Sequence, residues 1–190
     1  MTKAWPVKNL DPAGRVDTNA RRILAVRIAE FYSHVPALAK EDAVEELHAM
    51  RIGAKRLRYS LELFRDLYGK KGELQIDRVK QLQEELGHIH DIDVRVGLIE
   101  QELLAIAKEQ IEELSQSLSG APADEQRAIV TATLRPPPDD PRRGLFALLG
   151  RQHSARRQHR LKLLELWETF AAEGFRADLV KLSSPTSSKS

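Results

Sequence analysis

Apolar residues along most of this chain recur every three or four positions, the spacing that places side chains on one face of an α-helix. The pattern predicts helices over 17–35, 41–68, 74–118, 124–134 and 141–173. No sustained alternation of apolar β-branched residues with polar residues is present, so no strand is predicted. The fold class expected from this pattern is all-α, built of up-and-down helical bundles.

Proline and glycine mark where these segments should end. Pro36 stops the first helix, and Gly69 follows the second at the position where glycine commonly ends a helix. The third segment would be about 65 Å long if unbroken. We therefore expect either a break near Gly87 or Gly97 or a long overhang. Gly174 is expected to end or kink the last helix.

The chain ends and one proline-rich run lie outside the periodic pattern. Residues 1–15 form an irregular lead-in, and the Ser/Thr/Pro residues of 183–190 predict a disordered tail. Prolines at 136–138 interrupt the chain, after which Asp140 is placed as an N-cap and Pro141 at the first helical position.

Cations occupy the middle of a face that the last helix should keep apolar. Eight positions between Leu145 and Phe170, spaced by threes and fours, fall within an arc of about 100° on a helical wheel. Apolar residues hold both ends of this face, while His153, Arg156 and Arg160 hold its centre. Buried cations are costly unless they are paired, so a negatively charged partner is expected.

A second basic row follows the apolar stripe of the helix predicted over 41–68. Its members are His48, Arg51, Lys55, Arg58, Glu62 and Arg65. A basic row beside a core stripe is expected to face a groove between packed helices. The spacing His-x-x-Arg-x-x-x-Lys/Arg recurs at His153, 105 residues later, and this short match indicates an internal repeat. Arg21 and Arg27 similarly flank the apolar face of the first helix.

The composition fits one helical domain in a reducing compartment. The 190 residues are 31% charged and 5% aromatic, and they include no cysteine. Disulfides and thiolate chemistry are thereby excluded. The first residues show no signal peptide, and no apolar run approaches the 18 or so residues of a membrane span. We expect a cytoplasmic protein that does not associate with membranes.

The net charge of +2 conceals a strong segregation of charge along the chain. Residues 142–162 hold seven Lys or Arg and no acid, and residues 48–71 hold seven against two acids. Residues 73–125 hold thirteen acids against four Lys or Arg. Such segregation concentrates positive potential in one place. The expected ligand is a compact and strongly anionic molecule, although pairing of the basic rows with the acids of 74–118 is the structural alternative.

Other kinds of site have weaker support in the sequence. Glu84, His88 and Asp91 share one face of a continuous helix and could hold a divalent ion, but Asp91 or Asp93 could equally cap a helix or pair with a basic residue. We expect no metal and no cofactor. No catalytic triad, glycine-rich phosphate loop or zinc-protease motif is present, so an enzyme acting on phosphate compounds is the less favoured alternative. A nucleic-acid-binding module would use the same cations, but aromatic stacking platforms are scarce.

Residues 48–64 (HAMRIGAKRLRYSLELF) resemble the first recognisable block of the CHAD family, the conserved histidine α-helical domain. Residues 82–94 (LQEELGHIHDIDV) resemble its second block, a Leu-Gly followed by acidic residues and Val. The resemblance covers about 15–115. It implies two up-and-down bundles related by a pseudo-twofold axis, and a central basic channel that binds inorganic polyphosphate without known catalysis.

The resemblance also implies which residues bind the ligand and how the chain is divided. His48, Arg51, Lys55, Arg56 and Arg58 match the basic motif of the family, whereas the second half departs from it and is short for a full second bundle. We expect one domain over 16–182, with a first bundle at about 16–118 and a second part at about 122–182. The expected partner is inorganic polyphosphate, including polyphosphate granules. The predicted binding residues are Arg21, Arg27, His48, Arg51, Lys55, Arg56, Arg58, His153, Arg156 and Arg160.

Overall fold

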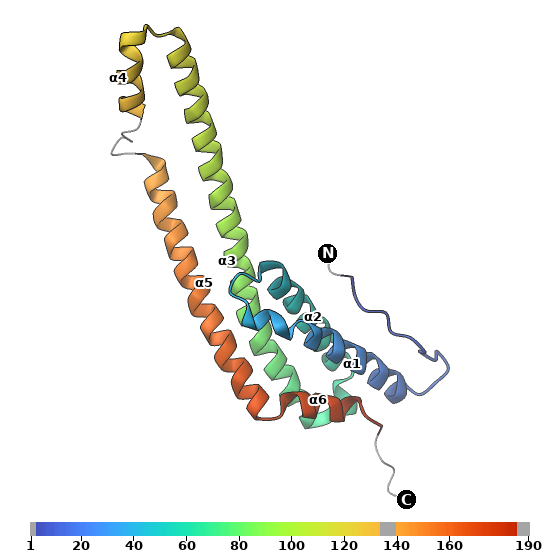
Figure 1. The fold of residues 1–190 in the computed structure, drawn as a ribbon. Helices are drawn as coiled ribbons and strands as arrows, with labels where there is room; N and C mark the ends of the chain where they lie inside the picture. Colours follow the sequence, from blue (N-terminus) through green and yellow to red (C-terminus); the bar gives the residue numbers. More distant parts are fainter. Residues whose placement is uncertain (1–2, 134–139, 186–190) are drawn as a thin grey trace, which may run out of the picture. The chain divides into compact units, whose positions relative to one another are not determined.

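The computed structural model describes residues 3–133 and 140–185, and within these ranges it contains six α-helices and no strand (Figure 1). The all-α prediction is therefore confirmed. A 3₁₀ helix, η1 (Val35–Ala39), follows the first helix. The α-helices are α1 (Val16–Ser33), α2 (Val44–Leu63), α3 (Arg65–Gly120), α4 (Ala123–Thr133), α5 (Pro141–Ala172) and α6 (Phe175–Ser183). None of the described helices is both long and apolar enough to cross a membrane.

The contacts divide the chain into two compact units. Unit 1 comprises residues 1–90 and 158–190, and unit 2 comprises residues 91–157. The long helices α3 and α5 each contribute one part to either unit. The two units are described separately below.

The core of unit 1 is formed where α1 packs against α2 and α6. The apolar stripe predicted for the second helix is buried as expected, and α3, α5 and α6 supply the remaining core side chains. Aromatic rings close this core, with the Phe31 ring 5.4 Å from Tyr32 and 6.1 Å from Trp167. Large buried side chains of α2, α3, α5 and α6 include Leu47, Met50, Leu57, Leu61, Leu82, Leu86, Ile89, Leu163, Phe175 and Leu179.

The junction between α2 and α3 differs from the sequence prediction. The second helix was expected to continue to Tyr68, but α2 ends at Leu63, and Phe64 leaves helical geometry with φ −110° and ψ 22°. A second irregularity follows at Gly69, whose φ of 53° favours glycine. The apolar periodicity runs through both points, because side chains on either side still face the core, and it therefore could not locate the break.

Helix α3 continues through Gly87 and Gly97, so the break at these glycines, one of the two alternatives expected, does not occur, and the helix is unbroken over 74–118. A helix-interior glycine costs only about 1 kcal/mol relative to alanine, which a long helix tolerates. Gly87 lies beside Arg51, and a Cβ at this position would be in ordinary van der Waals contact with the Arg51 Nε at 3.8 Å.

The ends of the other helices agree more closely with the sequence. Pro36 lies inside η1, so α1 stops at Ser33, two residues before the expected end. Gly174, with φ 78°, separates α5 from α6, which confirms the expected end. Ser183 is still part of α6. Residues 186–190 of the predicted tail lie outside the described residues.

The lead-in at the N-terminus is irregular, as expected, over the described residues 3–15. Hydrogen bonds nevertheless hold it against α1. The Trp5 amide donates to the Glu30 carboxylate at 3.2 Å, and the Asp11 amide donates to Asn19 at 3.1 Å.

Unit 2 pairs the second part of α3 with the first part of α5, and α4 lies between them in sequence. The prolines at 136–138 lie outside the described residues, but the start of the last helix is described. Helix α5 begins at Pro141, and the Arg142 amide donates to the Asp140 carboxylate at 2.9 Å. This confirms the predicted N-cap and first position.

Candidate functional site

The basic row of α2 faces α3 within unit 1. The Nδ1 atoms of His48 and His90 lie 3.1 Å apart, so one ring donates a hydrogen bond to the other. The Arg58 Nε donates to the Gln83 amide oxygen at 2.9 Å, ten residues further along α2 and seven residues earlier along α3. Arg51 lies between them, beside Gly87. The helical spacing therefore places His48, Arg51 and Arg58 along one seam between α2 and α3.

Lys55 lies on the exposed side of the same row. Its Nζ is 5.7 Å from the centre of the Tyr59 ring, and the Arg58 guanidinium is 4.9 Å from the same centre. Tyr59 is itself half exposed. These contacts hold two cations against one aromatic face that is open to solvent.

Three arginines of unit 1 bury a guanidinium nitrogen that has no hydrogen-bond partner among the described residues. The Nη1 of Arg78 lies 3.8 Å from the Asp178 carboxylate. The other two are the Nε of Arg51 in the α2 row and the Nη1 of Arg160 in α5. The Nη2 of Arg160 donates to the Leu38 carbonyl of η1 at 2.9 Å, which fixes the position of the group. A buried donor without an acceptor costs about 1–3 kcal/mol, so both nitrogens favour the approach of an acceptor atom.

Three histidines outside the predicted binding set lie in the same unit. His90 pairs with His48, while His88 stacks on His159 of α5 with 4.6 Å between ring centres. The Nδ1 of His159 lies 2.7 Å from the Glu85 carboxylate. The His-x-His spacing on α3 directs the two rings to different sides of the helix. The His90 ring faces α2, and the His88 ring faces α5. His159 was missed because it is adjacent to the face that contains Arg160, not on it.

The environment of His48 disfavours its charged form. Burial lowers the pKa of His48, and the nearby His90 and Arg51 lower it further, against a smaller opposing effect of Glu45. The neutral form of His48 is therefore favoured, and this form can donate or accept a hydrogen bond. The approach of a negative charge favours protonation of the ring.

Two of the predicted binding residues form a carboxylate cluster with Glu30 instead of projecting freely. The Arg27 and Arg56 guanidinium groups donate to Glu30 at 2.5 and 2.6 Å. Glu30 is 1% exposed, so its charge is compensated by these two cations within the protein. This cluster links α1 to α2 and, through Trp5, to the N-terminal segment.

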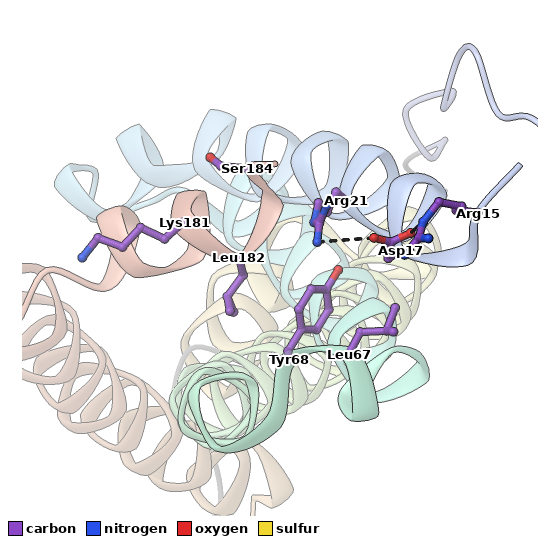
Figure 2. Close-up of a pocket in the computed structure, with 8 residues that line it drawn as sticks. All are labelled: Arg15, Asp17, Arg21, Leu67, Tyr68, Lys181, Leu182 and Ser184. Atoms are coloured by element: carbon purple, nitrogen blue, oxygen red, sulfur yellow. Dashed lines mark hydrogen bonds and ion pairs between the residues drawn. The ribbon is translucent and has the colours of Figure 1, made fainter. Parts of the chain in front are cut away.

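Arg21 lies in a different part of unit 1, in a pocket of about 320 Å³ at the start of α1. Its guanidinium is 3.5 Å from the Asp17 carboxylate, and the Tyr68 side chain reaches toward both from α3 (Figure 2). The Tyr68 hydroxyl is buried without a hydrogen-bond partner among the described residues, and burial raises its pKa to about 12. None of the residues that line this pocket belongs to the basic row of α2.

The predicted residues of the last helix are divided between the units. Arg160 belongs to unit 1, whereas His153 and Arg156 belong to unit 2. The Arg156 Nε donates to the Asp93 carboxylate at 2.5 Å, which confirms that an acid meets this cation and that Asp93 pairs with a basic residue. His153 is exposed.

The sequence offered Glu84, His88 and Asp91 as possible ligands of a divalent metal ion. Among the described residues, no group of three or more His, Cys, Asp or Glu side chains is placed to hold a metal ion. Of the proposed set, Glu84 and Asp91 are exposed, and His88 stacks on His159.

Comparison with known proteins gives one match. The family model described as the CHAD domain matches residues 2–100. This range contains α1, α2 and the first part of α3, including the whole basic row of α2. No curated protein and no solved structure matched the chain.

Proposed function

This chain belongs to the CHAD domain family, and from that membership we propose that it binds inorganic polyphosphate, or a similar polyanion, without catalysing its conversion. CHAD domains are generally associated with polyphosphate. A linear chain of phosphates presents a charged acceptor oxygen at every unit, and arginine supplies a planar set of donors that matches these oxygens.

The observation that supports the proposal best is the pair of buried guanidinium nitrogens without partners, the Arg51 Nε and the Arg160 Nη1. Elsewhere in unit 1 the chain compensates a buried charge fully, as at Glu30. A phosphate oxygen is the kind of acceptor that would satisfy both arginines, because it is anionic and small enough to approach a partly buried group.

The contacts suggest different roles for the predicted binding residues. Arg51, Lys55, Arg58, His48 and Arg160 are proposed to contact the polyanion. Arg27 and Arg56 already neutralise Glu30, so we assign them a positioning role. The remaining proposed members are Arg21, His153 and Arg156.

The architecture implied by the family is part of the same proposal. It consists of a first bundle at about 16–118 and a second, shorter part at about 122–182, related by a pseudo-twofold axis. Within unit 1, the basic row of α2 and Arg160 of α5 would then line one groove. Binding alone is proposed, because phosphoryl transfer would need a nucleophile held beside a base as well as cations.

The decisive experiment is a binding measurement with long-chain polyphosphate, followed by competition with RNA of mixed sequence. We expect saturable polyphosphate binding that RNA displaces only in large excess. Displacement by RNA at equal phosphate concentration would favour the nucleic-acid module. A parallel assay for released orthophosphate should show none above a protein-free control, and release that depends on the protein would establish an enzyme instead.

A further inference from the structure

Two adjoining pockets of unit 1 lie between the first turns of α3 and the end of α6. The first has a volume of about 320 Å³ and is the pocket that contains Arg21, and the second has a volume of about 250 Å³. Lys181 and Leu182 line both pockets, and no member of the basic row of α2 lines either. Pockets for small molecules measure about 300–1,000 Å³, so these volumes are suited to a small ligand and not to a polymer.

Each pocket is lined by a residue with a buried polar group that has no hydrogen-bond partner among the described residues. In the first pocket this group is the Tyr68 hydroxyl, which points toward Arg21 (Figure 2). In the second pocket it is the amide oxygen of Gln75, a residue that is only 2% exposed. Buried polar groups have a partner in the great majority of cases. Two such groups at neighbouring pockets therefore favour a ligand that supplies the missing partners.

The first pocket favours an anion. Three cations line it, Arg15, Arg21 and Lys181, together with one acid, Asp17. The Asp17 carboxylate lies 3.0 Å from the Arg15 guanidinium and 3.5 Å from that of Arg21, so its charge is already compensated. Burial raises the pKa of Tyr68 to about 12, so the hydroxyl keeps its proton at neutral pH and can donate it. A phosphate group accepts from several donors that approach from different directions, as these do.

The second pocket combines hydrogen-bond acceptors with two lysines. The acceptors are the Gln75 amide oxygen and the Asp178 carboxylate, and the lysines are Lys71 and Lys181. Asp178 lies 3.1 Å from Lys181, which leaves other acceptor positions of the carboxylate open. A hydroxyl group suits this lining, because it donates to the oxygens and also accepts from a lysine. An amine on the ligand would be repelled by the two lysines.

We propose that the two pockets together hold one small phosphate monoester whose organic part carries hydroxyl groups, as a polyol phosphate does. The phosphate group accepts from Arg21 and from the Tyr68 hydroxyl, and a ligand hydroxyl donates to the Gln75 amide oxygen. Of the predicted polyphosphate-binding residues, Arg21 is thereby assigned to a site separate from the seam between α2 and α3. The proposal goes beyond polyphosphate binding and does not depend on it.

The first test is titration calorimetry of the full chain with glycerol phosphate, inorganic phosphate and glycerol as separate probes. We expect glycerol phosphate to bind more tightly than inorganic phosphate, because it alone reaches both pockets. Glycerol should show no binding, because it lacks the anion. Absence of binding by glycerol phosphate, or equal affinity for the two phosphate probes, would overturn the proposal.

Two variants separate the ends of the site. Tyr68→Phe removes the donor to the phosphate group, so it should weaken binding of both phosphate probes by about tenfold. Gln75→Leu removes the acceptor of the ligand hydroxyl, so it should weaken glycerol phosphate by about fivefold and leave inorganic phosphate unchanged. The matched controls are Tyr32→Phe and the exposed Gln81→Leu, which lie outside both pockets and should bind as wild type does. Equal losses in variants and controls would contradict the site.

Chemical denaturation of the same variants separates a binding role from a structural one. Tyr68→Phe and Gln75→Leu each remove a buried oxygen that has no partner in the described part of the chain. The free energy of unfolding should therefore stay level or rise, while binding weakens. A clear fall in either variant would show that the oxygen is already satisfied within the protein, and the proposed contact would be wrong.

Long-chain polyphosphate shows whether this site is separate from the seam between α2 and α3. Tyr68→Phe should bind polyphosphate as wild type does, and Arg51→Glu should bind glycerol phosphate as wild type does. Parallel losses of both ligands in either variant would indicate one shared site and would overturn the proposal.

Discussion

The arginines of unit 1 differ in whether an acidic side chain lies beside them, and Glu30 accounts for the clearest difference. Arg27 and Arg56 meet at Glu30, whose buried carboxylate accepts from both. Arg51 lies five residues before Arg56 on α2 and is beside Gly87 instead of an acid, so its Nε stays without an acceptor among the described residues. The residues that most favour an external anion are therefore those the protein does not neutralise itself.

Arg51→Glu should weaken binding of long-chain polyphosphate far more than Arg127→Glu. Arg127 lies exposed on α4, outside both basic rows, and the two substitutions change the net charge equally. A charge-assisted hydrogen bond is worth about 1.5–3 kcal/mol, which corresponds to a loss of about tenfold or more at Arg51. Titration calorimetry on both variants measures the difference. Equal losses would mean that the attraction is diffuse and that no binding groove exists at α2.

The pH dependence of binding should depend on His48. Its pKa is lowered in the free protein, chiefly by burial and then by His90 and Arg51. A bound phosphate chain stabilises the imidazolium, so the pKa rises on binding and a proton is taken up. Affinity should therefore be highest at mildly acidic pH and fall as the pH rises through the pKa of the complex, while the arginine contribution persists.

His48→Gln should flatten this dependence between about pH 5.5 and 8 and retain most of the binding at the upper end. Replacement of the exposed His153 by Gln provides the comparison in unit 2. Long chains are the right probe, because terminal phosphates themselves titrate near pH 6. A His48→Gln profile identical to that of wild type would show that the histidine pair is structural.

At the level of elements, the period of 3.6 residues locates helices well and their junctions poorly. Five predicted segments correspond to α-helices of the structure, and the N-cap at Asp140 was predictable because a proline follows it. The break at Phe64 was not, since an apolar residue on the core stripe gives no local signal for it. The pairing of His90 with His48 and of His88 with His159 was not predicted, because it depends on how α3 packs against its neighbours.

The Glu30 cluster links elements that are distant in sequence, so its loss should affect the stability of unit 1. Glu30→Ala leaves Arg27 and Arg56 without their shared acceptor, and breaking a buried ion pair in this way costs about 3–5 kcal/mol. Chemical denaturation measures the loss. Glu62→Ala is the matched control, because its pair with Arg58 at 3.2 Å involves a 40% exposed carboxylate, and such pairs contribute about 1 kcal/mol or less. Similar losses in both variants would contradict a structural role for the cluster.

At the level of the whole chain, charge is separated by segment instead of being balanced locally. Basic residues of α2 and α5 and acids of α3 nearly cancel, so the net charge of +2 says little about the potential at any one site. Some of this separation is used internally, as in the Arg156–Asp93 pair. Among the described residues, Lys55 is exposed and forms no ion pair, and the buried Arg51 Nε has no hydrogen-bond partner, so both can contribute to attraction of a polyanion.

The dependence of binding on salt should report how many of these cations act together. A polyanion releases condensed counterions when cations neutralise it, with a slope of log affinity against log salt of about −0.7 per neutralised charge for a single-stranded chain. If Arg51, Lys55, Arg58 and Arg160 all contribute, the slope for long-chain polyphosphate should be about −3. Lys55→Gln should make it shallower by about 0.7, because this exposed side chain contributes charge and no core packing. The exposed Lys108, which pairs with Glu112 on α3, serves as the control, and Lys108→Gln should leave the slope unchanged. A slope near zero for wild type would indicate a neutral or hydrophobic ligand in place of a polyanion.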